Sequence, residues 1–73
     1  MIINNDVYRM EHGKDPKGNG YWFFEIIGID KTGNTIVETM LKKGNLSSAR
    51  KWACELFGRL YESSSITEVI TKP

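Results

Sequence analysis

Only two residues of this chain could together support nucleophilic catalysis. His12 is the only histidine and Cys54 the only cysteine, and a catalytic thiol needs a base within hydrogen-bonding reach. No partner can be placed near His12, which lies beside a glycine-rich stretch, so we interpret it as an exposed loop residue. Cys54 falls on the flank of an expected helix, where a structural cysteine is the ordinary interpretation. We therefore assign neither residue a catalytic role.

Acid–base or metal chemistry would need acidic side chains that converge. Four acidic side chains on adjacent expected strands could suggest a carboxylate cluster: Asp6, Glu11, Glu25 and Glu38. The hairpin register derived below places Glu25 and Glu38 on opposite faces, so they cannot act as a pair. No metal-ligand spacing occurs, and the glycines at 18 and 20 lack the strand–loop–helix context of a phosphate-binding loop. The sequence thus predicts a protein that is not an enzyme and holds no metal or cofactor.

Basic side chains are the remaining candidates for a binding site. Four of them bracket the start of an expected helix, and free N–H groups at a helix N-terminus attract anions. The candidates for anion or nucleic-acid binding are Lys14, Lys17, Lys42, Lys43, Arg50 and Lys51. The alternative is an ordinary solvated surface, and the net charge of +1, from ten basic and nine acidic residues, argues against strong nonspecific nucleic-acid binding.

The strongest structural pattern is a hairpin of two apolar strands, residues 21–29 and 35–41. β-branched and aromatic residues fill both segments, as is typical of strands. Between them, Asp30 followed three residues later by Gly33 predicts a type I turn with a left-handed glycine. If Asp30 faces Asn34, Ile27 lies opposite Val37.

Both faces of this hairpin are apolar, which a sheet with one solvated face would not show. A helix from Leu46 to about residue 61, capped by Asn45, has a broad apolar stripe and can cover one face only. We assign it to the face of Trp22 and Phe24, where Gly28 leaves room for a bulky helix residue such as Trp52. The face left uncovered carries the interface candidates Tyr21, Phe23, Ile27, Ile29, Val37 and Leu41. A contiguous exposed apolar patch of this kind usually marks an interface.

The other elements complete one small domain over residues 1–73. We expect a strand from about residue 3 to 11, a loop over 12–20, and a closing strand over 66–71 that lies parallel to the first or at an edge, with Ile66 and Ile70 on one face. The predicted fold class is α+β, in the order β-β-β-α-β, with an antiparallel three-stranded sheet, one helix on one face and a short C-terminal strand.

Length and composition set the remaining expectations. A chain of 73 residues builds one thin core. The single cysteine rules out an internal disulfide, which favours a reducing compartment and a cytoplasmic protein. No segment approaches the roughly 20 apolar residues that span a bilayer, so we expect no membrane contact.

Part of the chain resembles a known family. The segments Gly20-Tyr21-Trp22, Gly44-Asn45-Leu46-Ser47-Ser48-Ala49 and Trp52-Ala53, with Gly33 in the turn, are similar to the arm-type DNA-binding domain of phage integrases. That resemblance covers residues 20–60 and implies three antiparallel strands and a helix, with the sheet in the DNA major groove. The strands here lack the family's outward rows of arginine and lysine, and a strand follows the helix.

Our expectation for function is a nonenzymatic binding module that acts on a protein partner or on a second copy of itself, as a homodimer through the uncovered face. In size and in its lack of catalytic groups the chain is similar to short phage or mobile-element proteins that inhibit a host system by binding, such as anti-CRISPR proteins. This likeness is one of class and implies no site residues. The alternative is a small DNA-binding protein that uses the basic cluster and the sheet.

Overall fold

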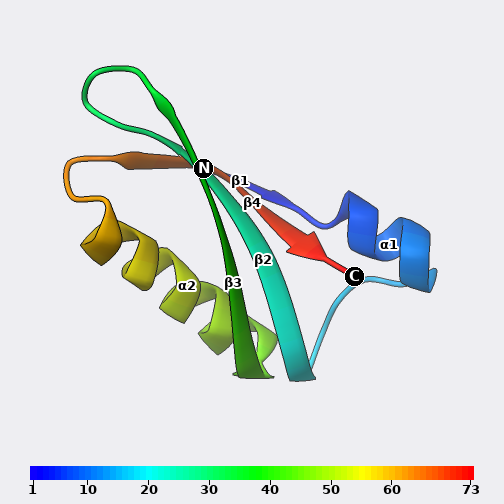
Figure 1. The fold of residues 1–73 in the computed structure, drawn as a ribbon. Coiled ribbons are helices and arrows are strands. Elements are labelled where there is room, and N and C mark those ends of the chain that lie inside the picture. The colour runs from blue at the N-terminus through cyan, green and yellow to red at the C-terminus, as the bar shows by residue number, and fades with distance from the viewer.

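The computed structural model describes residues 1–73 and shows a small α+β domain in which one sheet carries two helices (Figure 1). The expected single helix and three-stranded sheet are therefore incomplete. The elements in chain order are β1 (Ile2–Asn4), α1 (Asp6–His12), β2 (Asn19–Ile29), β3 (Thr35–Asn45), α2 (Leu46–Leu60) and β4 (Ser65–Lys72).

The sheet is four-stranded and mixed, with strand order β1-β4-β2-β3. β4 pairs in parallel with β1 and antiparallel with β2. Of the two positions expected for the last strand, the one parallel to the first strand is confirmed. The other, at an edge, is wrong, because β4 lies inside the sheet. The prediction of a purely antiparallel sheet was wrong, because the last strand enters between the first strand and the hairpin.

The N-terminal segment differs most from the expected structure. A three-residue strand is followed by a seven-residue helix, where a single strand was expected over residues 3–11. The Asn4 side chain accepts a hydrogen bond from the Asp6 backbone N–H, and Gly13 ends the helix in the left-handed conformation with φ 71°. A residue with a short polar side chain before the first turn and a glycine after the last are ordinary helix boundaries. The alternation of Tyr8 and Met10 was therefore not a strand signal.

The central hairpin forms in the predicted register. Ile27 lies opposite Val37, and Phe23 lies opposite Leu41. In the turn, the Asp30 N–H donates to the Asn34 carbonyl over 2.9 Å, and Gly33 has φ 87°. The predicted three-residue loop with a left-handed glycine is confirmed.

Helix α2 also begins and ends close to the predicted residues. The Asn45 side chain accepts a hydrogen bond from the Ser47 N–H, as the capping prediction requires. The buried residues of the helix are Leu46, Ala49, Ala53 and Phe57. Their spacing of three or four residues places one stripe against the sheet.

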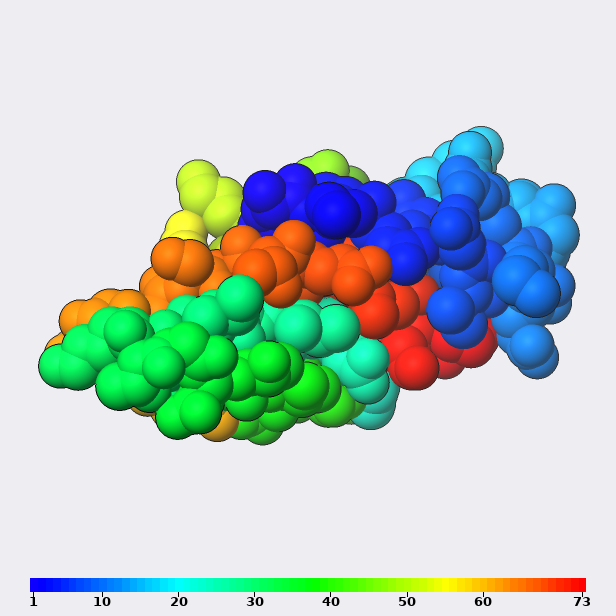
Figure 2. Space-filling model, turned by 90° about the horizontal axis from the view of Figure 1, so that it is seen from above, coloured from blue at the N-terminus to red at the C-terminus, as the bar shows by residue number.

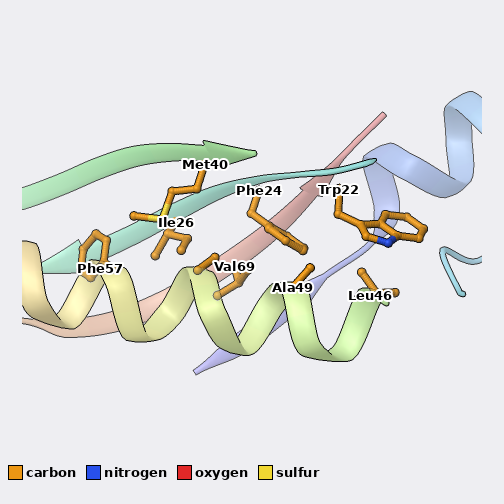
Figure 3. Close-up of a cluster of buried hydrophobic side chains, with 9 residues drawn as sticks. Trp22, Phe24, Ile26, Met40, Leu46, Ala49, Phe57 and Val69 are labelled. Atoms are coloured by element: carbon orange, nitrogen blue, oxygen red, sulfur yellow. The ribbon is translucent and has the colours of Figure 1, made fainter. Parts of the chain in front are cut away.

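The core lies between α2 and the sheet face that was predicted for it (Figure 3). Trp22, Phe24 and Ile26 project from β2 toward the helix, and Met40 and Val69 join them from the neighbouring strands. Successive residues of a strand point to opposite faces, so the residues between these must lie on the other side of the sheet.

Gly28 makes room for the helix, but the residue that fills the room is Phe57 and not Trp52. A Cβ atom at Gly28 would lie 2.8 Å from Cζ of Phe57 and 2.8 Å from the Ser65 carbonyl oxygen. Phe57 is fully buried, while Trp52 is only partly buried and packs against the rim of the core. The prediction for Trp52 was wrong because the apolar stripe is broad, and Trp52 lies at its margin.

Candidate functional site

We call the side of the sheet turned away from α2 the outer face. Figure 2 looks onto this face and shows β1, β4, β2 and β3 side by side, with α2 visible only behind them. The six predicted interface residues all lie on it, in alternation with the buried residues of β2 and β3. Tyr21 is 71% exposed, and Val37 and Leu41 are each 55% exposed. Phe23, Ile27 and Ile29 are less exposed but also have no helix over them.

The apolar side chains of the outer face form two rows across the strands. Phe23 and Leu41 make one cross-strand pair, and Ile27 and Val37 make the other. Side chains directly opposite each other on antiparallel strands have Cβ atoms about 5 Å apart. Each row is therefore a contiguous apolar strip across the hairpin.

A polar row separates these two strips. Glu25 lies between Thr39 on β3 and Ile70 on β4. Two lysines border the patch: Lys72 is opposite Phe23, and the Lys43 ammonium lies 5.5 Å from the centre of the Tyr21 ring. The outer face is thus apolar with dispersed charge, a composition found at protein interfaces.

The outer face also includes Ile70, which is not among the six predicted interface residues. Ile70 lies opposite Glu25 on the outer face, while Ile66 lies opposite Gly28 and packs against the core. The expectation that Ile66 and Ile70 share a face was wrong, because the register of β2 and β4 shifts between Ile27 and Gly28. An extra residue at such a bulge turns the rest of the strand over, and the alternation in 66–71 gave no sign of it.

Helix α1 does not cover the outer face, because it is attached to the opposite side of the sheet. Tyr8 lies with its ring centre 5.8 Å from that of Trp22, a residue of the buried core. Beside the helix, the Thr71 hydroxyl donates to the Asn5 side chain over 2.8 Å, and Thr71 is fully buried on the helix side. Both helices therefore pack away from the outer face.

The basic candidates do not form one surface. The Lys42 ammonium lies on the helix side, 4.7 Å from the centre of the Trp52 ring, while Lys43 points to the outer face. Lys14 and Lys17 are in the exposed segment between α1 and β2.

Arg50 and Lys51 are on the second turn of α2, where Nε of Arg50 is buried without a hydrogen-bond partner.

The N-terminus of α2 is partly occupied by groups of the chain itself. The Leu46 N–H donates to the Gly18 carbonyl over 2.9 Å, and the Ser47 N–H donates to the Asn45 side chain over 3.0 Å. Both are N–H groups that an anion at a helix N-terminus would use. Two of the N–H groups next to the basic cluster are therefore already bonded within the chain.

The reactive side chains are on different helices. His12 was expected in a loop but lies on the last turn of α1. Its ring stacks on that of Tyr8, and the two ring centroids are 4.1 Å apart. Cys54 is on α2, and burial raises the pKa of its thiol. A raised pKa leaves less of the nucleophilic thiolate at neutral pH.

The carboxylates are also separated. Glu25 points to the outer face, and Glu38 points to the helix side, where it accepts a hydrogen bond from the Tyr61 hydroxyl. This hydrogen bond raises the pKa of Tyr61. The register prediction that Glu25 and Glu38 lie on opposite faces is confirmed. The surface has no pocket, and no group of three or more histidine, cysteine or acidic residues could hold a metal ion.

Comparison with known proteins adds no relative: no family model, curated protein or solved structure matches this chain. Neither helix has the length and apolar character that a bilayer-crossing helix needs.

Proposed function

We propose that this protein is a nonenzymatic binding module that recognises another protein through the outer face of its sheet. The observation that carries this proposal is the pair of exposed apolar rows, Phe23 with Leu41 and Ile27 with Val37, over which neither helix lies. Exposing such rows to water is unfavourable by about 25 cal/mol for each Å² of apolar surface. A partner that covers them gains that free energy.

The size of the face supports a specific interface. The molecule has principal extents of 38 × 21 × 15 Å. A rectangle with the two larger dimensions has an area of about 800 Å², so a whole broad side of the molecule is about as large as the surface that each partner buries in a standard-size protein interface. The outer face also carries charges of both signs, Glu25 in the polar row and Lys43 and Lys72 at its border. Charges of complementary sign on a partner would fix its orientation on this face.

The experiment is capture of binding partners from an extract of the cells that produce the protein, with matched variants as bait. Phe23→Ser and Leu41→Ser each remove one apolar side chain from the same row. Leu60→Ser is the control, because Leu60 is 56% exposed but lies at the end of α2, away from the outer face.

We expect the parent and Leu60→Ser to retain the same partner, and the two outer-face variants to lose most of it. All four proteins should show the same circular dichroism spectrum, since the changed side chains lie outside the core. Equal capture by all four would contradict the proposal.

The finer expectation, an inhibitor of a host system of the kind that phages and mobile elements carry, stays a prediction, and the identity of the captured partner tests it. The alternative of DNA binding loses support from the positions of Lys42 and Lys43 on opposite faces. A gel shift at two salt concentrations tests it in the same preparation, because phosphate contacts weaken steeply as salt rises.

A further inference from the structure

The edge of the sheet formed by β3 is a second uncovered surface. The two edge strands of the sheet are β1, with three residues, and β3, with eleven. Figure 2 shows β3 as the rim of the molecule, with no helix beyond it. A strand at an edge presents a row of unpaired backbone groups.

The hairpin hydrogen bonds identify which groups these are. The Asp30 N–H donates to the Asn34 carbonyl, and hydrogen-bonded pairs alternate with non-bonded pairs along an antiparallel ladder. The even-numbered residues of β3, from Ile36 to Gly44, therefore bond to β2. The odd-numbered residues, among them Val37, Thr39 and Leu41, direct their N–H and C=O groups away from the sheet.

This edge has few of the features that prevent strands from pairing with other molecules. Such features include charged side chains, a proline, a bulge, a very short strand or a covering loop, and of these β3 has the charges of Glu38, Lys42 and Lys43. β3 contains no proline, and it pairs with β2 without a register shift from Thr35 to Asn45. A continuous edge of this length is a template for another strand.

We propose that β3 pairs antiparallel with β3 of a second copy of this chain, about a two-fold axis at Met40, and that the protein is a dimer with one continuous eight-stranded sheet. Met40 is the midpoint of Thr35–Asn45. This register therefore pairs all of β3 with all of its counterpart, and it places the outward N–H and C=O groups of one copy against those of the other.

Charge complementarity selects the second copy as the occupant. Glu38 and Lys42 are the only charged residues of β3 on the helix side, and they lie at equal distances along the strand from Met40. In the proposed register each Glu38 lies opposite the second copy's Lys42, so the pair forms twice. Non-bonded antiparallel pairs have Cα atoms about 4.5 Å apart, which brings these side chains into contact.

Other registers lose this match. With the axis at Thr39, a register shift of two residues, Glu38 would lie opposite Met40 and Lys42 opposite Ile36. With the axis at Glu38, a register shift of four residues, the two carboxylates would face each other. A second copy was expected on the outer face, but the edge supplies both the unpaired backbone groups and the opposite charges. In this dimer the two outer faces remain free and become one surface.

The test is a charge exchange followed by analytical ultracentrifugation over a concentration series. The parent should sediment with twice its monomer mass of 8.3 kDa at high concentration. Glu38→Lys alone places a lysine opposite the second copy's Lys42, and Lys42→Glu alone places two glutamates opposite each other. Each of these variants should dimerise about tenfold more weakly or worse, because two opposed like-charge pairs replace two favourable ones.

Mixing the two single variants should restore the dimer as a heterodimer, and the double variant Glu38→Lys with Lys42→Glu should dimerise like the parent. Glu38 also accepts a hydrogen bond from Tyr61, and Lys42 lies over the Trp52 ring, so a single variant could weaken the dimer by disturbing the fold. Restoration of the dimer by the second charge change would show that the loss comes from the charge pairs between the two copies. Phe23→Ser is the control on the outer face and should leave the dimer unchanged.

A parent chain that stays monomeric at several hundred micromolar would overturn the proposal. So would single variants that dimerise as well as the parent, or a mixture that forms no heterodimer. A dimer that resists the charge exchange but is lost in Phe23→Ser would place the second copy on the outer face instead. If Phe23→Ser loses the captured partner but still dimerises, the result bears only on the outer face. Partner binding by the outer face and dimerisation through β3 can therefore fail independently.

Discussion

The two faces of the sheet are built from the same two long strands, yet one is a core and the other is a surface. On the helix side, Phe24 and Ile26 are fully buried, and polar groups are paired: the Trp22 indole N–H donates to the Gly44 carbonyl over 2.9 Å. On the outer face, Phe23 and Leu41 have similar chemistry but are 40% and 55% exposed. Alternation along the strand places neighbours of the same character in opposite environments.

This difference shows that composition alone does not decide which side of a sheet becomes the core. α2 has fifteen residues and covers one face, and α1 is attached at the same side through Tyr8. The outer face keeps its apolar side chains without a cover of its own. An apolar surface of this extent has a physical explanation if it is covered by another protein.

The largest effect is expected where the helix side is most tightly packed. Phe57→Ala should lower the free energy of unfolding by about 3–5 kcal/mol, because it removes a fully buried aromatic ring and leaves a cavity. Urea unfolding followed by circular dichroism measures this. Leu60→Ala on the same helix is the control, since that side chain is 56% exposed and should change stability little.

A second substitution tests the close approach of helix and sheet. Gly28→Ala should cost about 1–3 kcal/mol, because the added methyl group would lie 2.8 Å from Phe57 and from the Ser65 carbonyl. Gly20→Ala adds the same group to the same strand where no heavy atom lies within 4 Å. Equal stability of the two variants in thermal unfolding would show that the helix does not pack at Gly28.

Trp52 tests the margin of the core. Trp52→Ala should cost about 1–2 kcal/mol, less than Phe57→Ala, because the ring is only partly buried and its second contact is a cation–π interaction with Lys42. The same urea titration compares the two variants directly. A larger loss of unfolding free energy for Trp52→Ala than for Phe57→Ala would show that Trp52, and not Phe57, contributes more to the core.

The smallest expected effect on stability concerns the hairpin turn. This turn sets the register of β2 and β3, and the register decides which residues point to each face. The hydroxyl of Thr32 and the N–H of Asn34 donate to the Asp30 carboxylate and hold the pKa of this carboxyl below its ordinary value of 3.8. A lowered folded-state pKa adds stability above the ordinary pKa, and this stability is lost as the pH falls through the folded value.

Asp30→Asn keeps an acceptor oxygen but cannot titrate. We expect the melting temperature of the parent to fall relative to that of Asp30→Asn as the pH is lowered below 3.8. Melting curves between pH 2 and pH 7 measure the difference. Parallel curves for the two proteins would mean that Asp30 is not held in its ionised form by the turn.

The parts of the fold that were predictable from the sequence depend on local patterns. The hairpin register follows from Asp30 and Gly33, and α2 follows from Asn45 and the apolar stripe after it. The side of the sheet that α2 covers was also correctly predicted, because Glu38 is the only charged residue among the core-facing positions of the segments 22–28 and 36–40.

The parts that were missed depend on contacts between distant residues. The bulge opposite Gly28 arises where β4 pairs with β2. The sequence of residues 66–71 alone therefore could not show that Ile66 and Ile70 point to opposite faces of the sheet. The helix at residues 6–12 is short, and contacts such as Tyr8 with Trp22 hold it in place. For the candidate site, the six predicted residues lie on the outer face as expected, but Ile70 was added by the fold.

The central claim is that the outer face is open in the single chain and covered in the complex with its partner. The most direct measurement is the broadening of methyl signals by a soluble paramagnetic agent, recorded for the protein alone and with the captured partner. We expect the methyl groups of Val37 and Leu41 to broaden in the free protein and to be protected in the complex, while those of Leu60 stay accessible in both. Unchanged broadening at Val37 and Leu41 in the presence of the partner would contradict this account.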